Sequence, residues 1–385
     1  MKLSFGMVGG GNGAFIGNVH RRAAYEENLA VLRAGCFSRS PEQNRATAEA
    51  WDVSDLSRVY SSYREMAEAE SKREDGIDFV SIVTPTDTHF EIAKCFLEHG
   101  IHVVCDKPIS MTLEEGLALQ KLAHERELMF GVTYTYASYA VIRQAREMIE
   151  RGELGKILNI IAEYPQDWLI VSTVAKKSEQ STWRTDPARA GTTACCSDIG
   201  THLESLIARM TGLRLESVLA RFTHFQGSPL EHDIQVLLNY EGGVPGMMWA
   251  SQIAIGNDCG VRIRVFGEKG SLEWCHTSPM QLIYAPLNEP VRIMTANKEY
   301  CYSACTEQCR LPAGHPEGFY EAFGNVYHSY CLHLLKKKGA DVDPGDFRHP
   351  TVDDGVAGLR FVDACLRSEQ LGNVWVPLYG NEAQS

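Results

Sequence analysis

The sequence predicts an α/β protein with two domains. The first is an N-terminal doubly wound domain with a parallel sheet, and the second is a C-terminal α+β domain with a large, mostly antiparallel open sheet. The length of 385 residues exceeds what one hydrophobic core usually organises. The first third of the chain alternates short apolar runs with helical patterns, which is typical of βαβ units, whereas from about residue 155 strand-like runs follow one another without regular helices. We therefore expect the first domain over residues 1–130 and the second over residues 131–385.

Each expected strand is a run rich in apolar and β-branched residues that ends at a glycine, a proline or a polar turn. In the first domain these runs cover residues 3–11, 30–38, 77–85, 101–108 and 128–136. In the second domain they cover residues 156–164, 218–225, 234–240, 246–255, 261–267 and 270–274. Helical patterns in the second domain cover residues 197–212, 316–338 and 351–371. The polar stretch 170–193 is expected to be a long functional loop.

The composition argues against several classes of partner. The formal net charge is −12 and the longest basic run is Lys336–Lys338, so the chain lacks the concentrated basic face that nucleic acid or an anionic membrane needs. No stretch is apolar for long enough to cross a bilayer, and the N-terminus becomes glycine-rich before a signal-peptide core could form. We expect a cytoplasmic protein.

The twelve cysteines are scattered through apolar segments, which favours reduced, mostly buried thiols. Cys301, Cys305 and Cys309 are spaced regularly and would line one face of a helix, so a metal site has to be weighed. No fourth ligand lies close in sequence, the nearest histidine is His315, and tetrahedral sites usually begin with a tighter pair. We expect no metal site, and a role for the three cysteines stays open.

The segment "GMVGGGNGAFIGNVHR" follows an apolar strand and opens a helix, the context in which a glycine pattern predicts a dinucleotide-binding loop. Gly9 and Gly11 let the backbone turn and approach a pyrophosphate, whose charge the N–H groups at the helix start would meet. Strict spacing puts Ala14 at the third glycine position, whereas Gly17 fits the helix-packing glycine after an insertion of about three residues. The alternative is an ordinary glycine-rich turn. The expected cofactor contacts in this loop are Gly9, Gly11, Asn12, Gly13, Ala14, Phe15 and Ile16.

The end of the second strand should meet the adenosine ribose of the cofactor. A carboxylate there would favour NAD, and a basic residue would tolerate the 2′-phosphate of NADP. The sequence offers Ser38 and Arg39 and no acid, which leans chemically toward NADP. Arg39 could equally point into solvent, so the choice between NAD and NADP stays open.

Another strand ends in "VVCDKPIS", where an acid, a lysine and a proline follow an apolar run. The carboxyl end of a parallel strand lies on the ligand side of a doubly wound sheet. Pro108 biases Lys107 toward an extended backbone, which fixes the direction of its ammonium group. We expect Asp106 and Lys107 beside the cofactor. The residues expected to line the nicotinamide side at the neighbouring strand end are Thr84, Pro85 and His89.

In "AGTTACCSDIGTHLESL", Asp198 and His202 lie four residues apart at the start of a helix, so both side chains share one face. A histidine can take a proton near neutral pH, and a nearby carboxylate can orient it or bind a substrate hydroxyl. Each residue also has a structural alternative: Asp198 as an acid in the first turn of a helix, and His202 as a buried core histidine.

Together, the glycine loop, the DKP segment and the "SDIGTH" helix resemble the Gfo/Idh/MocA family of nicotinamide-dependent sugar and cyclitol oxidoreductases. The segment "GELGKI" at the domain junction extends the resemblance over nearly the whole chain. The resemblance implies a Rossmann domain and a catalytic site made of an E-K-P lysine and a D-x-x-x-H pair, here Lys107, Asp198 and His202. Two departures are Asp106 in place of glutamate, and "GTTACCSD" with little of the usual glycine run.

The resemblance further implies hydride transfer between a carbinol carbon and a nicotinamide cofactor that can stay bound between turnovers. His202 would take the hydroxyl proton, Lys107 would hydrogen-bond the same oxygen, and Asp198 would position the substrate or His202. The substrate would carry a secondary ring hydroxyl, at C3 by similarity to a subgroup, on a sugar, glycoside or inositol. The side chains expected to bind it are Tyr134, Tyr136, Gln166, Trp168, Trp183, Arg184, Asp198, His202 and His315.

Two other functions fit the same resemblance. One is NAD-dependent glycoside cleavage through transient oxidation and elimination, and the other is a dinucleotide-sensing regulator without catalysis. Retention of Lys107, Asp198 and His202 argues against the regulator but does not separate dehydrogenation from cleavage. The resemblance also implies a homo-oligomer, a dimer or tetramer, that associates through the broad face of the second-domain sheet.

Overall fold

A computed structural model describes residues 2–175 and 186–380 of the chain. The chain forms two compact units, each with a sheet of its own. The first unit consists of Met1–Thr135 and Phe319–Val356, and the second consists of Tyr136–Gly318 and Ala357–Ser385.

The first unit is built on five parallel strands in the order β2-β1-β3-β4-β5. The strands are β1 Leu3–Gly9, β2 Ala30–Cys36, β3 Phe79–Val83, β4 His102–Cys105 and β5 Phe130–Val132. The helices are α1 Phe15–Glu26, α2 Pro41–Ala50, α3 Tyr63–Glu70, α4 His89–Glu98, α5 Leu113–Glu125 and α12 Phe319–Lys337. The strand order reverses between β1 and β3, and such a reversal places the ligand site of a doubly wound sheet at the carboxyl ends of these strands. The expected doubly wound arrangement is confirmed.

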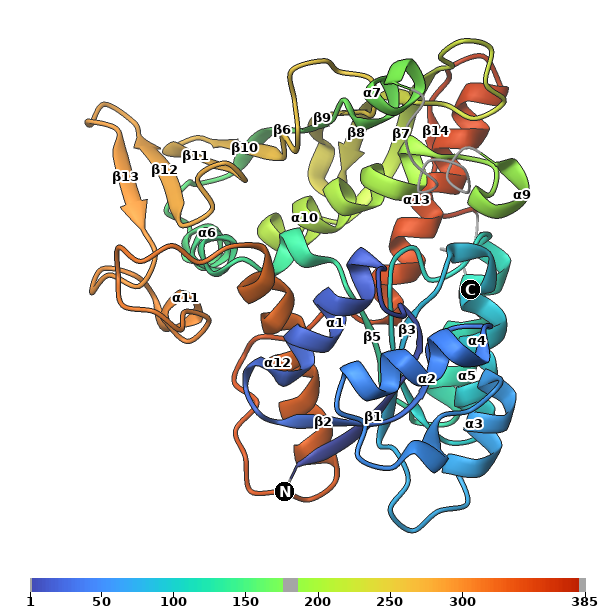
Figure 1. Ribbon diagram of the computed structural model, residues 1–385. Coiled ribbons are helices and arrows are strands. Elements are labelled where there is room, and N and C mark those ends of the chain that lie inside the picture. Colours follow the sequence, from blue (N-terminus) through green and yellow to red (C-terminus); the bar gives the residue numbers. More distant parts are fainter. Residues whose placement is uncertain (1, 176–185, 381–385) are drawn as a thin grey trace. The chain divides into compact units, whose positions relative to one another are not determined.

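Helix α12 lies beside α1 although the two helices are far apart in the sequence (Figure 1). Its side chains Tyr327 and Tyr330 are fully buried in the core of the first unit with Phe5 and Phe79 of the sheet. The sequence predicts residues 319–356 in the second domain because they follow its strands along the chain. The structure groups them with the first unit instead, because the apolar face of α12 packs on α1 and on the parallel sheet.

The second unit is built on nine strands in the order β13-β12-β11-β10-β6-β9-β8-β7-β14, all paired antiparallel except β6 with β9. The strands are β6 Ile157–Pro165, β7 Leu215–Thr223, β8 Asp233–Tyr240, β9 Val244–Ser251, β10 Arg262–Gly267, β11 Gly270–Cys275, β12 Gln281–Pro286, β13 Arg292–Thr295 and β14 Val376–Pro377. The helical segments are α6 Ala140–Glu150, α7 Trp168–Ala175, α9 Pro187–Ala190, the π-helical turn η4 Cys196–Gly200, α10 Thr201–Thr211 and α11 Ser303–Thr306. Helix α13 Val352–Gln370 begins in the first unit and ends in the second.

The large, mostly antiparallel sheet that the sequence predicts is confirmed, and the structure extends it at both edges. Strands β12, β13 and β14 have no counterpart among the predicted strands. The stretch 170–193 is not one continuous loop in its described parts, because α7 ends within it and α9 lies inside it. The run "WLIVSTVA" of α7 is apolar, and Asp186 caps α9 by accepting a hydrogen bond from the Ala188 N–H.

The two sheets differ in how their strands are buried. Every residue of β3 is buried, as expected for a parallel strand covered on both faces. Strand β8 alternates instead, with Ile234, Val236 and Leu238 buried and Leu237 exposed between them. The second sheet therefore has one face turned to a core and one face that residues 2–175 and 186–380 leave open.

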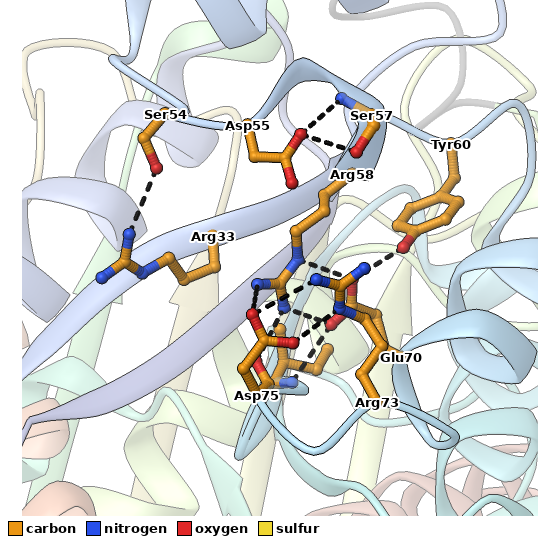
Figure 2. Close-up of polar contacts among 10 residues, drawn as sticks. Arg33, Ser54, Asp55, Ser57, Arg58, Tyr60, Glu70, Arg73 and Asp75 are labelled. Atoms are coloured by element: carbon orange, nitrogen blue, oxygen red, sulfur yellow. Dashed lines mark hydrogen bonds and ion pairs between the residues drawn. The ribbon is translucent and has the colours of Figure 1, made fainter.

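A buried ionic network lies at the loop that leads into β3 (Figure 2). Arg58 and Glu70 are only 4% and 2% exposed, and the guanidinium Nε of Arg58 donates to Glu70 Oε1 at 2.9 Å. Tyr60 Oη donates to Glu70 Oε1 at 2.7 Å, and the Ile77 N–H donates to Oε2 at 3.2 Å. Both carboxylate oxygens are therefore bonded, and the network fixes the start of β3 without reaching the carboxyl ends of the strands.

All twelve cysteines are free thiols. Cys309 Sγ donates to the Cys305 carbonyl oxygen at 3.4 Å. The residues that the structure describes contain no group of three or more histidine, cysteine or acidic side chains suited to holding a metal ion. Within the same residues, no helix is long and apolar enough to cross a membrane.

Candidate active site

The loop between β1 and α1 has the tight backbone of a dinucleotide-binding turn. Gly9 and Gly13 have φ angles of +83° and +95°, in the left-handed region that favours glycine. A Cβ atom on Gly17 would lie 2.1 Å from the Gly10 carbonyl oxygen, so α1 can approach the loop this closely only with glycine there. Gly17 rather than Ala14 is therefore the glycine that packs the helix against the loop.

The start of α1 is open to a ligand. The N–H groups of Asn12 and Ala14 are used within the first unit, in hydrogen bonds of 3.0 and 2.9 Å. The N–H groups of Phe15 and Ile16 begin the helix and have no intrahelical acceptor. A Cβ atom on Gly13 would meet no atom within 4 Å, and the Phe15 side chain is 62% exposed. The first turn of α1 thus fits the pyrophosphate of a dinucleotide.

The turn after β2 carries the residues that the sequence places near the adenosine ribose. The Ser38 hydroxyl donates to Gln43 Oε1 at 3.1 Å, and the Arg39 side chain is exposed. The turn contains no carboxylate between Cys36 and Ser40. Arg39 is therefore available to a ligand at this strand end.

His89 is a buried link between two strand ends. Its side chain is 1% exposed, with Nε2 at 2.8 Å from the Thr84 carbonyl oxygen and Nδ1 at 2.8 Å from the Pro108 carbonyl oxygen. The sequence predicts His89 as a lining residue of the nicotinamide side. That role stays a prediction, and the two ring contacts tie the loop after β3 to the half-buried Lys107 and the buried Pro108, which are joined by a cis peptide bond.

Asp106 follows β4 and accepts two hydrogen bonds on one oxygen. The Lys107 N–H donates to Asp106 Oδ1 at 2.9 Å, and Thr133 Oγ1 donates to the same oxygen at 3.0 Å. The Asp106 N–H in turn donates to the Ile82 carbonyl oxygen at 2.9 Å. The carboxylate and the lysine after it are therefore fixed at the carboxyl ends of β3, β4 and β5.

Asp198 and His202 lie on consecutive helical segments of the second unit, η4 and α10. Single π-helical turns of this kind are often found at functional sites. Gln252, which is 2% exposed, donates from Nε2 to Asp198 Oδ2 at 3.0 Å. His202 is 8% exposed. The buried amide of Gln252 thus orients the carboxylate beside the candidate catalytic histidine.

Glu231 holds the start of the segment that carries Asp198. Its carboxylate accepts hydrogen bonds from the Ala194 N–H at 3.0 and 2.9 Å and from the Cys196 N–H at 2.7 Å. The Asp198 N–H donates to the Ala194 carbonyl oxygen at 2.9 Å. Burial raises the pKa of Glu231 to about 7, although the backbone N–H groups favour its ionised form. Glu231 therefore caps η4 and introduces a titratable group there.

Tyr164 links Tyr136 to Gln166, and Tyr136 in turn contacts His202. The rings of Tyr136 and His202 meet edge to face, with centroids 4.9 Å apart. Tyr136 Oη and Tyr164 Oη are 2.7 Å apart, and Gln166 Nε2 donates to Tyr164 Oη at 3.3 Å. Burial raises the pKa of both tyrosines. Their hydroxyls therefore stay protonated at neutral pH and act as hydrogen-bond donors and acceptors.

A cysteine and a histidine lie behind Tyr136. Cys259 Sγ is 3.3 Å from Tyr136 Oη, and His276 Nε2 is 3.0 Å from Tyr139 Oη. Burial alone would raise the pKa of Cys259, but hydrogen bonds from His276 and from the tyrosines lower it. Burial would likewise lower the pKa of His276, but the hydrogen bond to Cys259 raises it. The pair supports the Tyr136 ring from the side of the sheet.

Comparison with known proteins places this geometry in a family. Residues 3–134 match the family model "Oxidoreductase family, NAD-binding Rossmann fold", and residues 142–273 match the "GFO/IDH/MocA C-terminal domain". The uncharacterized oxidoreductase YfiI of Bacillus subtilis is 36% identical over 381 residues, which cover 97% of this chain and 96% of that protein. The chain belongs to the Gfo/Idh/MocA oxidoreductase family.

Two solved structures of an inositol dehydrogenase homologue from Azotobacter vinelandii are also similar. The complex with NAD⁺ is 36% identical with a TM-score of 0.93, covering 98% of this chain and 97% of that chain. The complex with NADH and myo-inositol is 35% identical with a TM-score of 0.91, covering 98% of each chain. The glucose-6-phosphate 3-dehydrogenase of Bacillus subtilis is 26% identical over 215 residues, which cover 53% of this chain and 58% of that protein. The chain thus carries an NAD-binding Rossmann domain within a family of sugar and cyclitol oxidoreductases.

The remaining residues that the sequence predicts for the substrate of this Gfo/Idh/MocA protein have different surroundings. Tyr134 is 1% exposed, whereas Trp168 is half-buried at the start of α7. His315 is exposed, and its ring is engaged locally with the Pro312 carbonyl oxygen at 3.1 Å. Trp183 and Arg184 lie outside the described residues.

Sequence reasoning missed four residues that hold the predicted ones in place. These are Tyr164, Glu231, Gln252 and His276. Each lies in or next to a strand of the second sheet, where a polar side chain on a buried or half-buried position is the signal that could have found it. Without knowledge of strand pairing, nothing in the sequence connects these positions to Asp198 or His202.

Proposed function

We propose that the protein oxidises a secondary ring hydroxyl of a cyclitol, sugar or glycoside and transfers the hydride to a nicotinamide dinucleotide. The observation that carries the proposal is the buried His202 on α10, together with Asp198 on the preceding turn η4, whose carboxylate Gln252 orients. A histidine and a fixed carboxylate are suited to removing a hydroxyl proton and to binding a neighbouring hydroxyl.

In the mechanism, His202 takes the proton of the reacting hydroxyl. Lys107 hydrogen-bonds the same oxygen and stabilises the alkoxide charge that develops as the proton leaves. Asp198, held by Gln252, binds a neighbouring hydroxyl or orients His202. The rings of Tyr136 and His202 pack edge to face, and this contact limits the rotation of the imidazole.

The dinucleotide supplies the hydride acceptor when it is bound. The first turn of α1 holds its pyrophosphate, and the loops after β3 and β4, with Thr84, Pro85, Asp106 and Lys107, hold its nicotinamide end. Arg39 binds the adenosine side, where it can accept the 2′-phosphate of NADP. The similar Azotobacter vinelandii structures are complexes with NAD⁺ and NADH, which supports NAD as the cofactor.

The relatives support the substrate class. The solved homologue at 35% identity is described with myo-inositol, which favours a cyclitol or a pyranose with several equatorial hydroxyls. The name of the glucose-6-phosphate 3-dehydrogenase supports oxidation at C3 of a sugar ring, although that similarity covers only part of the chain. A polyol of this kind needs several hydrogen-bonding groups and an apolar ring face, which Gln166, Tyr136 and Trp168 supply.

A substrate panel tests the proposal. Purified protein is mixed with NAD⁺ or NADP⁺ and with myo-inositol, other inositols, free hexoses or alkyl glucosides, and the absorbance of the reduced nicotinamide is followed. Reduction with one class names the substrate, and NMR of the product identifies the oxidised carbon. Release of a free sugar from a glycoside without net reduction would show glycoside cleavage instead. Dinucleotide binding with no turnover of any compound would favour a regulator.

The open face of the second sheet supports a homo-oligomer. Paired strands align an apolar row across this face, made of Leu219, Leu237, Met247 and Ile161. Arg264 and Glu273 interrupt the row, and it continues with Ile283 and Ile293. Leu237 and Met247 are 46% and 45% exposed in the single chain. Such a row is typical of a surface buried between copies. Light scattering after size exclusion is expected to give a dimer or tetramer, and a monomer at all concentrations would contradict this.

The cytoplasm is the compartment that we assign to the enzyme. The twelve free thiols fit a reducing environment, and the nicotinamide cofactor is available there. Fractionation of the source cells, with the protein detected by an antibody, checks this assignment.

A further inference from the structure

Three side chains from different elements of the first unit form a buried hydrogen-bonded chain. His20 of α1 is fully buried, and its Nδ1 lies 2.8 Å from Tyr327 Oη of α12. Tyr327 Oη lies 2.8 Å from Ser81 Oγ of β3. The second ring nitrogen, Nε2 of His20, is 4.0 Å from Asp106 Oδ1 and is otherwise without a hydrogen-bond partner in the described structure.

The chemistry of these groups fixes where the protons lie. Burial lowers the pKa of His20 to about 4, so the ring is neutral and carries one N–H. If Nδ1 carried the proton, the lone pair of Nε2 would face the Asp106 carboxylate, and two acceptors would oppose each other in a buried place. In the other arrangement, Ser81 donates to Tyr327, Tyr327 donates to His20 Nδ1, and the N–H of Nε2 points to Asp106. In this arrangement each hydroxyl donates one hydrogen bond, Nδ1 accepts one, and the only N–H of the ring faces the carboxylate.

Asp106 is the residue on which this chain acts. Its Oδ1 already accepts from the Lys107 N–H and from Thr133 Oγ1. A side-chain movement of about 1 Å brings His20 Nε2 within hydrogen-bond length of the same oxygen. All three donors then converge on Oδ1, which leaves Oδ2 as the oxygen that can meet a ligand. The side chain of Asp106 is 17% exposed, so this second oxygen is within reach of the surface.

We propose that His20 is a positioning residue that, with Tyr327 donating to its Nδ1 and Ser81 donating to Tyr327, orients Asp106 and through it Lys107 toward the dinucleotide. The proposal rests on the proposed function, because Asp106 and Lys107 have to meet the cofactor. It adds residues from α1, α12 and β3 that do not touch substrate or cofactor themselves. It also gives α12 a role in the site, because Tyr327 of this helix is the hydrogen-bond partner of His20.

Two substitutions of one residue separate positioning from packing. The amide nitrogen of glutamine takes about the place of Nε2, so His20→Gln keeps a donor for Asp106. Asparagine reaches only about as far as Nδ1, so His20→Asn keeps the contact with Tyr327 and loses the donor. The matched control is His102→Asn in the same unit. His102 begins β4, has a pKa lowered to about 4 by burial, and accepts a hydrogen bond from the Met129 N–H at 3.0 Å.

The variants are compared by NADH titration in a calorimeter, by kcat and KM with the best polyol, and by thermal unfolding. We expect His20→Gln to stay within about threefold of the wild type in NADH affinity and in kcat/KM. We expect His20→Asn to lose about tenfold or more in both, with a Tm no lower than that of His102→Asn, whose kinetics are unchanged. Equal behaviour of His20→Gln and His20→Asn, or an equal loss in the His102 control, would overturn the proposal.

Nitrogen NMR of the imidazole gives a test that does not depend on activity. In the wild type the His20 ring should be neutral from pH 5 to 9, with the proton on Nε2, and the proton should stay on Nε2 in Tyr327→Phe because this nitrogen still faces the Asp106 carboxylate. A proton on Nδ1 in the wild type would refute the chain of donors. If the wild type oxidises no polyol, the proposed function fails, whereas the NADH affinities and this spectrum still decide the role of His20.

Discussion

Two buried polar networks in the first unit differ in whether all their polar groups are hydrogen-bonded within the network. In the network of Arg58 and Glu70, both carboxylate oxygens are bonded inside the protein, and its members lie at the loop before β3 (Figure 2). In the chain of His20 and Tyr327, the last group points to Asp106 after β4, at the opposite ends of the strands. One network is closed, and the other ends at a residue of the candidate site.

This difference indicates which buried polar groups stabilise the fold and which arrange the candidate site. A closed ionic network cannot be broken without leaving a buried charge, so its loss acts on folding. A neutral chain that ends at a partly exposed carboxylate can lose a hydrogen bond and still fold, so its loss acts on the geometry of the site. The predictions below test whether this division between stability and activity holds.

The largest effect is expected at the candidate catalytic residues. Lys107→Ala and His202→Ala should each lower kcat by about 100- to 10,000-fold, because charge stabilisation or proton removal is lost. The Tm of both variants and the NADH affinity of His202→Ala should stay close to those of the wild type. Steady-state kinetics, calorimetry and thermal unfolding measure these quantities, and near-normal turnover in both variants would remove the proposed mechanism.

The closed network should show the reverse pattern. Glu70→Gln leaves the buried Arg58 without its counter-charge and should lower the free energy of unfolding by about 3 to 5 kcal/mol, measured in urea. The folded fraction should keep the kcat and KM of the wild type. Asp75→Asn is the control, because Asp75 is the exposed partner of the same arginine and should leave the urea midpoint unchanged. A kinetic defect in folded Glu70→Gln would break the division.

Glu231 is a buried acid next to the candidate catalytic helix, and its titration is expected to change the stability of the protein. Its folded pKa of about 7 lies above the ordinary value of 4.5, so the folded state binds the proton more tightly than the unfolded state does. Stability should therefore be highest below pH 4.5 with respect to this group and should fall by about 3 kcal/mol as the pH rises to 7. In Glu231→Gln this slope should disappear from urea titrations between pH 5 and 8. An unchanged slope would show that another group titrates there.

The smallest effect is expected at the exposed Arg39. If its guanidinium meets a 2′-phosphate, Arg39→Ala should weaken NADP⁺ binding by about tenfold and leave NAD⁺ binding nearly unchanged. Ser38→Ala is a matched control from the same turn and should affect neither cofactor strongly. Calorimetric titration with both cofactors measures the difference, and equal losses for NAD⁺ and NADP⁺ would reject a role in phosphate binding.

The sequence predicts the fold well because its patterns are local. The glycine turn, the apolar strands and the helix of His202 are each visible within a short window. The place of α12 is not, because only the packed structure shows that Tyr327 and Tyr330 complete the core of the first unit. The same limit hides β13 and β14, which are short edge strands that depend on pairing with their neighbours.

The candidate site follows the same rule. Lys107, Asp198 and His202 can be predicted from short motifs, because each motif carries its chemistry within a few residues. The contacts of His20, Gln252 and His89 cannot be predicted in this way, because they join residues far apart along the chain.

The most direct test of the central claim follows the hydride itself. Ring-deuterated myo-inositol and a ring-deuterated glucoside are each incubated with the protein and NAD⁺, the protein is denatured, and the nicotinamide is examined by mass spectrometry. Denaturation also captures a cofactor that stays bound between turnovers. We predict one deuterium on the reduced nicotinamide with one of the two substrates, and none with the His202→Ala variant. Absence of deuterium from both free and released cofactor, for these polyols and for the rest of the panel, would contradict the proposed dehydrogenation.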